Sequence, residues 1–149
     1  MYDLEKLDKR KFVFGNIFLL SNRLQTVMDR TTDELTAKQW FVLMVLEMFE
    51  EPPTLKMLAD MYDSSHQNIK QLVLKLEKKG FVRVEDDPTD RRTMRIVATA
   101  KCQQWDEENK AITEDFLNRM FNHLTAEEIE TLRTVQQKIY TNLGNMKEH

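Results

Sequence analysis

The sequence predicts a mainly α-helical protein with a small β-hairpin wing, a winged helix-turn-helix placed between long N- and C-terminal helices. Three observations predict this fold class. Glycine and proline each occur only three times in 149 residues, so helices should be long and loops few. Apolar residues recur at helical spacing along most of the chain, while residues 81–98 contain two short alternating segments. The apolar content of 41% is sufficient for a packed core.

The N-terminal part of the chain is expected to form two helices. Residues 4–30 carry apolar side chains close to the 3.6-residue period, which predicts the first helix. Thr36 is followed three residues later by Gln39, a capping box that should begin a strongly apolar helix over residues 40–49. The pair Pro52-Pro53 should end this second helix, because neither proline can continue the hydrogen-bond ladder.

Residues 55–74 have the spacing of a helix-turn-helix. Thr54 and Ser65 are expected to cap its two helices. Asp63 lies in the turn, where many such motifs have glycine, and aspartate tolerates the left-handed conformation better than most residues. Gly80 should end the second helix in that same conformation. An ordinary αα-corner has similar spacing, so the spacing alone leaves both interpretations open.

The exposed face of the second helix of this motif is polar, and it has no acid between Ser65 and Leu76. Amide side chains can pair with adenine edges, serine with bases or phosphates, and lysine with phosphates. An ordinary solvated helix face usually holds more glutamate, so the missing acids favour DNA. The predicted DNA contacts on this helix are Ser65, His66, Gln67, Asn68, Lys70, Gln71 and Lys75.

Two strands, over residues 81–86 and 93–98, should follow as a β-hairpin. Alternation places Val82, Val84, Met94, Ile96 and Ala98 inward. Arg83 and Arg95 should then point outward, and Arg95 is counted among the predicted DNA contacts.

The loop of this hairpin carries Arg91 and Arg92 at its tip. Such a tip can enter the minor groove, where narrow A·T-rich segments concentrate negative potential. Asp90 is expected to pair with one of these arginines and to fix the shape of the tip. A merely exposed charged loop is the alternative, and the polar helix just before it favours the DNA contact.

Two more helices are expected after the hairpin. Thr99 should cap a helix over residues 100–123, and Thr125 with Glu128 forms a second capping box. The last helix carries an apolar stripe formed by Ile129, Leu132, Val135, Ile139, Leu143 and Met146. A partner helix from a second copy of the chain could cover this stripe, or the chain's own first helix could do so.

The net charge of −3 is distributed unevenly. Residues 65–97 carry eight basic and five acidic side chains, a balance of +3, whereas the rest carries 14 basic and 20 acidic side chains, a balance of −6. Phosphate contacts are local, so the basic segment is compatible with nucleic acid despite the acidic total.

Features that the sequence lacks narrow the possible cellular compartments and classes of function. The longest apolar run, residues 40–46, is far shorter than the roughly 20 residues needed to cross a bilayer. The N-terminus lacks the layout of a signal peptide, and a single cysteine excludes an internal disulfide. These features predict a cytoplasmic protein without a membrane partner. His66, His123 and His149 form no metal-ligand or nucleophile pattern, and no P-loop or dinucleotide motif occurs, so we expect no enzyme, no metal and no cofactor.

Together these residues resemble the MarR family of winged-helix regulators. The similarity is carried by Leu35-Thr36, Gln39, Leu58-Ala59, Ser65, Leu76-Glu77-Lys78-Lys79-Gly80-Phe81-Val82, Asp87-Pro88-Thr89-Asp90-Arg91-Arg92 and Ala98-Thr99. Two positions depart from the family pattern: Ala98 replaces its usual leucine, and Cys102 replaces its usual glycine.

The resemblance implies a sequence-specific regulator of double-stranded DNA, a repressor that acts as a homodimer on a pseudo-palindromic operator. The predicted DNA-binding domain is residues 33–99, and residues 1–32 with 100–149 form the predicted helical dimerisation domain. Recognition helices would enter successive major grooves, with the wings in flanking minor grooves.

Many relatives also have a ligand cleft between the dimerisation helices and the winged helix, which implies a small aromatic effector. Phe14, Phe18, Trp40 and Met44 could line such a cleft here. Aromatic and methionine residues at helical spacing are more often plain core, and both interpretations stay open.

Two alternatives keep the same fold but change the role. One is a thiol-oxidation sensor that uses Cys102, which lies near a helix N-terminus that can lower a thiol pKa. Against it, peroxide-sensing relatives place their cysteine in the first helix, and a small residue near the surface is the simpler interpretation of Cys102. The other is a winged-helix protein-interaction module without DNA binding, which the polar helix face and the arginine tip disfavour.

Overall fold

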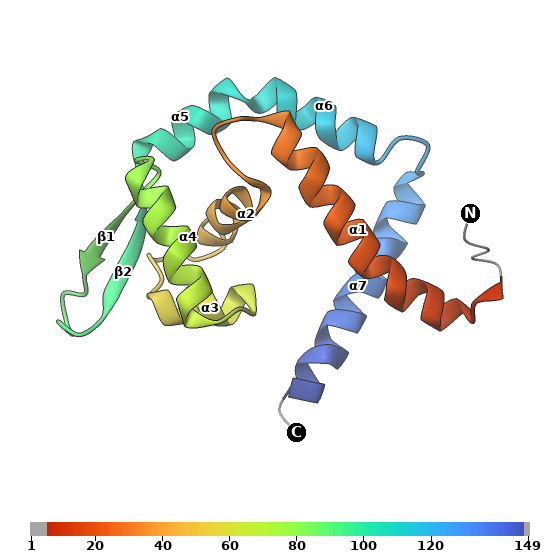
Figure 1. Ribbon diagram of the computed structural model, residues 1–149, viewed down its shortest axis with the longest axis horizontal. Helices are drawn as coiled ribbons and strands as arrows, with labels where there is room; N and C mark the ends of the chain where they lie inside the picture. Colours follow the sequence, from red (N-terminus) through yellow and green to blue (C-terminus); the bar gives the residue numbers. More distant parts are fainter. Residues whose placement is uncertain (1–5, 148–149) are drawn as a thin grey trace. The chain divides into compact units, whose positions relative to one another are not determined.

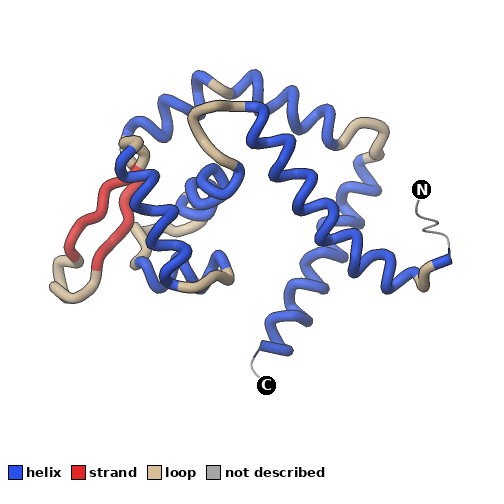
Figure 2. Tube along the Cα trace, viewed as in Figure 1, coloured by secondary structure: helices blue, strands red, loops and turns tan. Residues whose placement is uncertain are grey.

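The structure, a computed structural model, describes residues 6–147 (Figures 1 and 2). The described chain divides into two compact units, one that ends at Glu108 and one that begins at Asn109. The elements of the first unit are α1 (Lys9–Thr31), α2 (Ala37–Leu46), α3 (Leu55–Tyr62), α4 (His66–Lys78), β1 (Val82–Asp86), β2 (Met94–Ala98) and α5 (Ala100–Glu108). Those of the second are α6 (Lys110–Met120) and α7 (Ala126–Lys147). The predicted fold class is confirmed, while the predicted domain boundaries at 33 and 99 stay a prediction.

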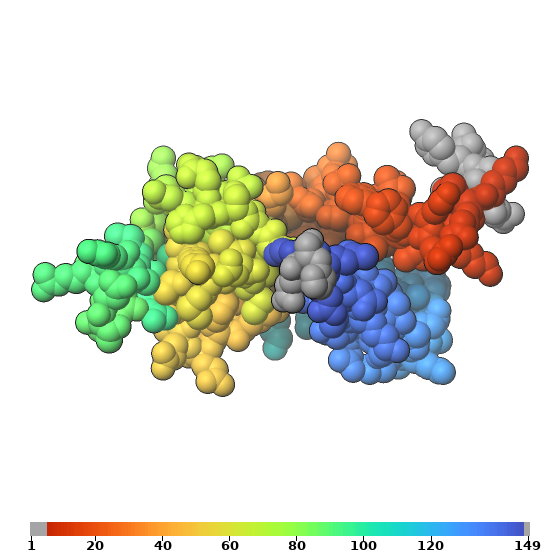
Figure 3. Space-filling view, turned by 90° about the horizontal axis from the view of Figure 1, so that it is seen from below, coloured from red at the N-terminus to blue at the C-terminus, as the bar shows by residue number. Residues whose placement is uncertain are grey.

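Strands β1 and β2 form a two-stranded antiparallel hairpin in which Val82 pairs with Ala98 and Asp86 with Met94. The hairpin protrudes beyond the helices that carry it (Figure 3). The segment just before α3 pairs with strand β2, because Ile96 N donates to Pro53 O at 2.9 Å. Backbone pairing therefore ties the wing to the start of the helix-turn-helix.

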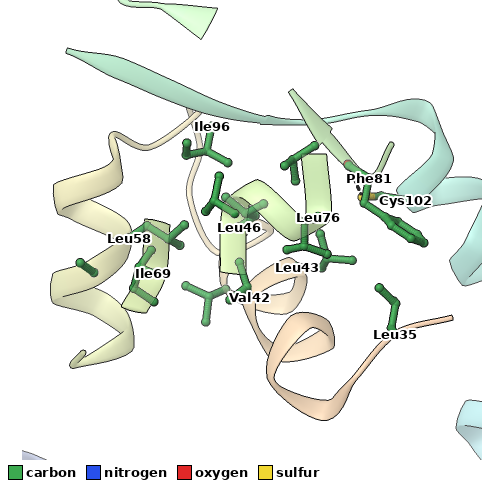
Figure 4. Packing of buried hydrophobic residues seen from close by; sticks show 14 of the residues in the cluster. Leu35, Val42, Leu43, Leu46, Leu58, Ile69, Leu76, Phe81, Ile96 and Cys102 are labelled. Carbon is green, nitrogen blue, oxygen red and sulfur yellow. Dashed lines mark hydrogen bonds between the residues drawn. The ribbon is translucent and has the colours of Figure 1, made fainter. Parts of the chain in front are cut away.

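The core of the first unit lies where α2, α3 and α4 meet the root of the hairpin (Figure 4). Leu58 of α3 and Ile69 of α4 are completely buried and come from the two helices of the motif. Phe81, between α4 and β1, is also completely buried. Burial of a leucine, isoleucine or phenylalanine side chain contributes about 1.5–3 kcal/mol, so these residues set how the wing and α4 are packed.

The local signals of the helix-turn-helix are confirmed. Asp63 follows α3 in the left-handed conformation, with φ 57° and ψ 43°. Ser65 caps α4, its Oγ accepting from Asn68 N at 3.2 Å. Gly80 has φ 86°, and this backbone conformation turns the chain from α4 into β1.

The start of α2 is held from two directions. Thr36 Oγ1 accepts from Gln39 N, and Gln39 Oε1 accepts from Thr36 N, both at 3.2 Å, which confirms the capping box. In addition, Asp29 Oδ1, in the last turn of α1, accepts from Ala37 N at 2.6 Å. Because the first amides of a helix have no partner within it, both contacts stabilise this end.

Two predicted helix boundaries are wrong. The first helix begins at Lys9, since the Asp8 carboxylate accepts from Arg10 N and Lys11 N as its N-cap. The apolar helix covers Ala37–Leu46 and ends well before the two prolines. Beyond Glu47 the amides donate to carbonyls three residues back: Met48 N donates to Val45 O at 3.1 Å and Phe49 N to Leu46 O at 3.3 Å, so a tight turn ends α2.

The single helix predicted over residues 100–123 is also wrong. The chain breaks it at Asn109, where φ is −104° and ψ is 7°, and α5 and α6 are separate helices. Trp105 is consequently part of the core of the first unit, while Ile112 and Met120 are exposed on α6 in the second. The capping box before α7 is confirmed, because Thr125 N donates to Glu128 Oε1 and Glu128 N donates to Thr125 Oγ1, both at 3.0 Å.

The apolar stripe on α7 is largely exposed. The exposed fraction is 38% for Ile129, 43% for Val135 and 70% for Met146, and no residue of α7 is buried. Helix α1 also has no buried residue, although Phe14, Phe18 and Leu20 lie on it. Apolar surface of this extent on two helices is typical of a protein that binds a partner.

Candidate nucleic-acid interface

Helix α4 has one buried and one exposed face. Ile69, Val73 and Leu76 are buried against the core. The predicted contact residues on this helix and its cap, Ser65, His66, Gln67, Asn68, Lys70, Gln71 and Lys75, are all exposed. The structure therefore exposes this whole set on α4 and its cap, and no acidic side chain lies between Ser65 and Leu76.

The amide side chains on α4 differ in how they are held. Asn68 Nδ2 lies 3.5 Å from Ser64 Oγ, within hydrogen-bond reach of the turn before the helix. Gln67 and Gln71 are four residues apart and therefore neighbours on the exposed face. An amide that presents one donor and one acceptor in a plane can bind the major-groove edge of adenine.

Glu77 is the first acid of α4, and it has a structural partner. Its Oε2 accepts from Val84 N at 3.0 Å, so the carboxylate connects the last turn of α4 with strand β1. The contact helps to fix the hairpin relative to the helix.

The hairpin tip is shaped by Asp90, although not as predicted. Its Oδ1 accepts from the backbone N of Arg92 at 3.0 Å, and its Oδ2 accepts from Thr93 Oγ1 at 3.1 Å. Among the described residues, Asp90 forms no ion pair with Arg91 or Arg92, and its carboxylate instead binds the backbone N–H of Arg92 and the hydroxyl of Thr93. Arg91 and Arg92 are exposed.

The strands differ from the predicted alternation at three side chains. Met94 and Ala98, both expected inward, are exposed at the two ends of β2, and Met94 is 53% exposed. Arg95, expected outward, is engaged inside the wing: its Nε donates to Asp87 Oδ2 at 2.7 Å, and its Nη1 donates to Pro52 O at 2.8 Å. Arg83 is exposed as predicted and pairs with Glu85 on the same strand.

Asp87 was named in the sequence only as part of the Asp-Pro-Thr-Asp-Arg-Arg motif, and no individual role was predicted for it. It is 6% exposed, and its Oδ1 accepts from Thr89 N at 2.8 Å and from Thr89 Oγ1 at 2.7 Å. The hydrogen bonds from Thr89, followed by that from Arg95, hold the pKa of Asp87 well below its usual range. A pKa lowered in the folded state adds stability that is present above about pH 4 and is lost only in stronger acid. The Asp-Pro-Thr sequence was the available signal, since aspartate commonly bonds to the backbone two residues on.

Of the four residues predicted to line a ligand cleft, three form aromatic contacts and the fourth, Met44, is exposed. The rings of Phe14 and Phe18 meet edge to face on α1 at 5.6 Å, and both are exposed. Trp40 is half-buried against Trp105, at 5.5 Å between ring centroids. Met44 is 46% exposed on α2. For Trp40 the packing supports a core role, and a ligand site at these residues stays a prediction.

Cys102 is a buried residue, so its expected place near the surface is wrong. Its Sγ donates to Phe81 O at 3.0 Å (Figure 4). Burial raises the pKa of the Cys102 thiol, which lowers the thiolate fraction and so disfavours a thiol sensor at neutral pH. Thr99 precedes α5 as predicted, but its Oγ1 donates to Gly80 O at 2.6 Å instead of capping the helix.

Within residues 6–147, no group of three or more His, Cys, Asp or Glu side chains is arranged to hold a metal ion. No helix in this described range combines the length and the apolar character needed to span a membrane.

Residues 33–93 match the profile of the MarR family. The match covers the helix-turn-helix and the hairpin up to the tip, the same segment that carries the exposed polar face and the two arginines. No protein with a curated description is significantly similar in sequence.

Solved structures with the same fold are numerous. A MarR protein from Peptoclostridium difficile has 20% identity and a TM-score of 0.81, over 98% of this chain and 94% of its own. The organohalide-sensing regulator RdhR, bound to 2,4-dichlorophenol, has 18% identity and a TM-score of 0.78, over 95% of this chain and 85% of its own. BpsR of Bordetella bronchiseptica, whose DNA binding is regulated by 6-hydroxynicotinic acid, has 20% identity and a TM-score of 0.73, over 86% of this chain and 98% of its own.

The family profile and the fold agree with the helix-turn-helix, the αL residue Asp63 and the wing described above. Residues 33–93 therefore match the MarR family of winged-helix regulators, and the chain as a whole has the fold of the solved MarR structures.

Proposed function

We propose that this chain is a repressor that binds a pseudo-palindromic operator in double-stranded DNA as a homodimer. One observation carries the proposal: the exposed polar residues of α4 between Ser65 and Lys75, which include no acid, lie in the same unit as a protruding hairpin with Arg91 and Arg92 at its tip. Helix α4 would read the major groove, and the two guanidiniums would enter the adjacent minor groove.

The homodimer is supported by the exposed apolar surfaces of α1 and α7. A second copy of the chain supplies a partner with the same surfaces, and a twofold dimer places two copies of α4 on a symmetric site. The binding is proposed to take place in the cytoplasm, without a metal, a cofactor or a catalytic step.

Selection of bound duplexes from a random pool tests this proposal. The expected product is a site with dyad symmetry, with half-sites about one helical turn apart and A·T-rich flanks. Binding should weaken steeply as salt rises, because each phosphate contact releases counterions. A selected site without dyad symmetry would contradict the dimer, and no binding at low salt would favour the protein-interaction alternative.

Two single substitutions on α4 should alter base preference more than affinity. Gln67→Ala and Asn68→Ala each remove an amide that can pair with adenine, a contact worth about 1–3 kcal/mol of discrimination. We expect repeat selections with these variants to give a relaxed base preference at one position of each half-site. Affinity for random duplex should stay near that of the wild type, whereas Lys75→Ala should weaken binding to all duplexes alike. If the selected site is identical for wild type and both amide variants, these residues do not read bases.

A small aromatic effector forms the second part of the proposal. It is supported by the aromatic ligands of RdhR and BpsR and by the exposed Phe14–Phe18 ring pair and Met44. Titration of the operator complex with 2,4-dichlorophenol or 6-hydroxynicotinic acid should release DNA and change the fluorescence of Trp40 and Trp105. Phe18→Ala and Met44→Ala should weaken the response without changing DNA binding in the absence of ligand. Titrations that match the wild type would remove both residues from the ligand site.

A further inference from the structure

Arg95 and Asp87 link the hairpin to the start of the helix-turn-helix. The guanidinium of Arg95 donates in two directions, to Asp87 Oδ2 at 2.7 Å and to Pro52 O at 2.8 Å. The side chain of Asp87 is 5% exposed and that of Arg95 is 30% exposed, so the ion pair is largely removed from solvent. One side chain thus joins the first residue of the tip loop to the segment just before α3.

Backbone pairing reinforces the link on the helix side. Thr54 forms an antiparallel bridge with Arg95. The same Thr54 is the N-cap of α3, with Oγ1 accepting from Met57 N at 3.1 Å. A change in the position of Arg95 would therefore act directly on the first turn of α3.

Asp87 organises the other side of the link. It accepts two hydrogen bonds from Thr89, and its own N–H donates to Thr93 O at 2.9 Å. Both ends of the tip loop are thereby held at Asp87, and Arg91 and Arg92 lie between them. A two-stranded hairpin alone is only marginally stable, so its direction needs support from the body of the protein.

We propose that Arg95 is a positioning residue that braces the wing together with Asp87, and that it does not contact DNA. The brace would fix the angle between the hairpin tip and α4, and so determine which minor-groove position the two tip arginines reach. This inference rests on the proposed DNA-binding function. Lysine could not replace Arg95, because a planar guanidinium bonds two acceptors in fixed directions and an ammonium does not.

The brace and a direct DNA contact predict opposite signs for Asp87→Asn. If Arg95 bound phosphate, removing the neighbouring negative charge would free the guanidinium and strengthen DNA binding. If Arg95 braces the wing, the substitution weakens binding, because the amide replaces one acceptor oxygen by a donor facing Thr89 or Arg95.

The experiment compares the unsubstituted 149-residue chain with Asp87→Asn, Arg95→Gln, Arg95→Lys and the double variant Asp87→Asn Arg95→Gln. Affinity for the selected operator should fall about tenfold in each single variant, and the double variant should be no weaker than the weaker single variant. Preference for A·T-rich flanks should be lost while the core of each half-site is still selected. Arg83→Gln is the matched control, since it removes an exposed arginine of β1 whose partner Glu85 is on the same strand.

A readout without DNA separates this inference from the proposed function. Trypsin should cut after Arg91 or Arg92 at least about fivefold faster in the Asp87 and Arg95 variants, because a locally released loop is cleaved in proportion to its open population. Cleavage after Lys70 in α4 should not change, which excludes global unfolding. Stronger DNA binding by Asp87→Asn, additive losses in the double variant, or an unchanged rate of tip cleavage would each overturn the brace. A wild type that binds no DNA would contradict the proposed function, and the cleavage rates would still decide on the brace.

Discussion

Replacing both tip arginines, Arg91→Ala with Arg92→Ala, is expected to weaken binding to the selected operator about 100-fold at roughly physiological salt. A dimer would lose four guanidiniums that sit at the ends of two protruding hairpins. The slope of log affinity against log salt should become shallower, by about one for each phosphate contact that is lost. Affinity measured at several salt concentrations gives both quantities.

The variant should remain folded, because both side chains are exposed and Asp90 shapes the tip through the backbone N–H of Arg92, which alanine retains. Its melting temperature should therefore stay close to that of the wild type. The matched control is Arg10→Ala with Arg119→Ala, two arginines whose side chains are 94% and 82% exposed on α1 and α6. The control makes the same change in net charge. Equal losses in the two double variants would mean that net charge, and not the wing, attracts DNA.

Introducing acids into the apolar stripe of α7, as Leu132→Glu with Leu143→Glu, should convert the proposed dimer into monomers. The two leucines are 41% and 55% exposed in a single chain, and a partner helix would cover that surface. Four buried carboxylates without partners would cost more than about 5 kcal/mol per dimer, which lowers the dimerisation constant by more than about 10³-fold. Sedimentation velocity at micromolar concentration measures this change directly.

Operator binding should be lost with the dimer, because one recognition helix makes only half of the contacts. The control is Gln137→Glu with Thr141→Glu, which adds the same charge to the opposite face of α7, since 3.6 residues per turn place these positions away from the stripe. This control should remain dimeric. A stripe variant that sediments as a dimer would show that α7 does not form the interface.

Local sequence signals predicted the elements of the DNA-binding region well. The Thr36–Gln39 box, the Ser65 cap and the left-handed Asp63 each depend on residues within a few positions of one another, so the sequence contains the whole interaction. The exposure of the polar residues between Ser65 and Lys75 was predicted for a similar reason, because helical periodicity determines which side chains share a face.

The predictions that were wrong depend on contacts between residues far apart in the chain, or on a helix break that no neighbouring residue signals. Arg95 appeared to be an outward strand residue because its partner carbonyl, at Pro52, lies 43 positions away. The burial of Cys102 depends on Phe81, 21 positions earlier. The break at Asn109 follows no proline or glycine, and apolar periodicity continues across it, so no local signal predicted two helices in place of one.

The hydrogen bond from Ala37 N to Asp29 Oδ1 has a mechanical consequence. It spans the connection between α1 and α2, so a rotation or shift of the last turn of α1 would break one of the contacts that hold the start of α2. Helix α2 in turn packs its buried side against the core that seats α4. A movement of α1, caused by whatever binds its exposed apolar side chains, would therefore be passed through this connection to α2. Helix α2 supports α4, which carries the proposed DNA-reading surface.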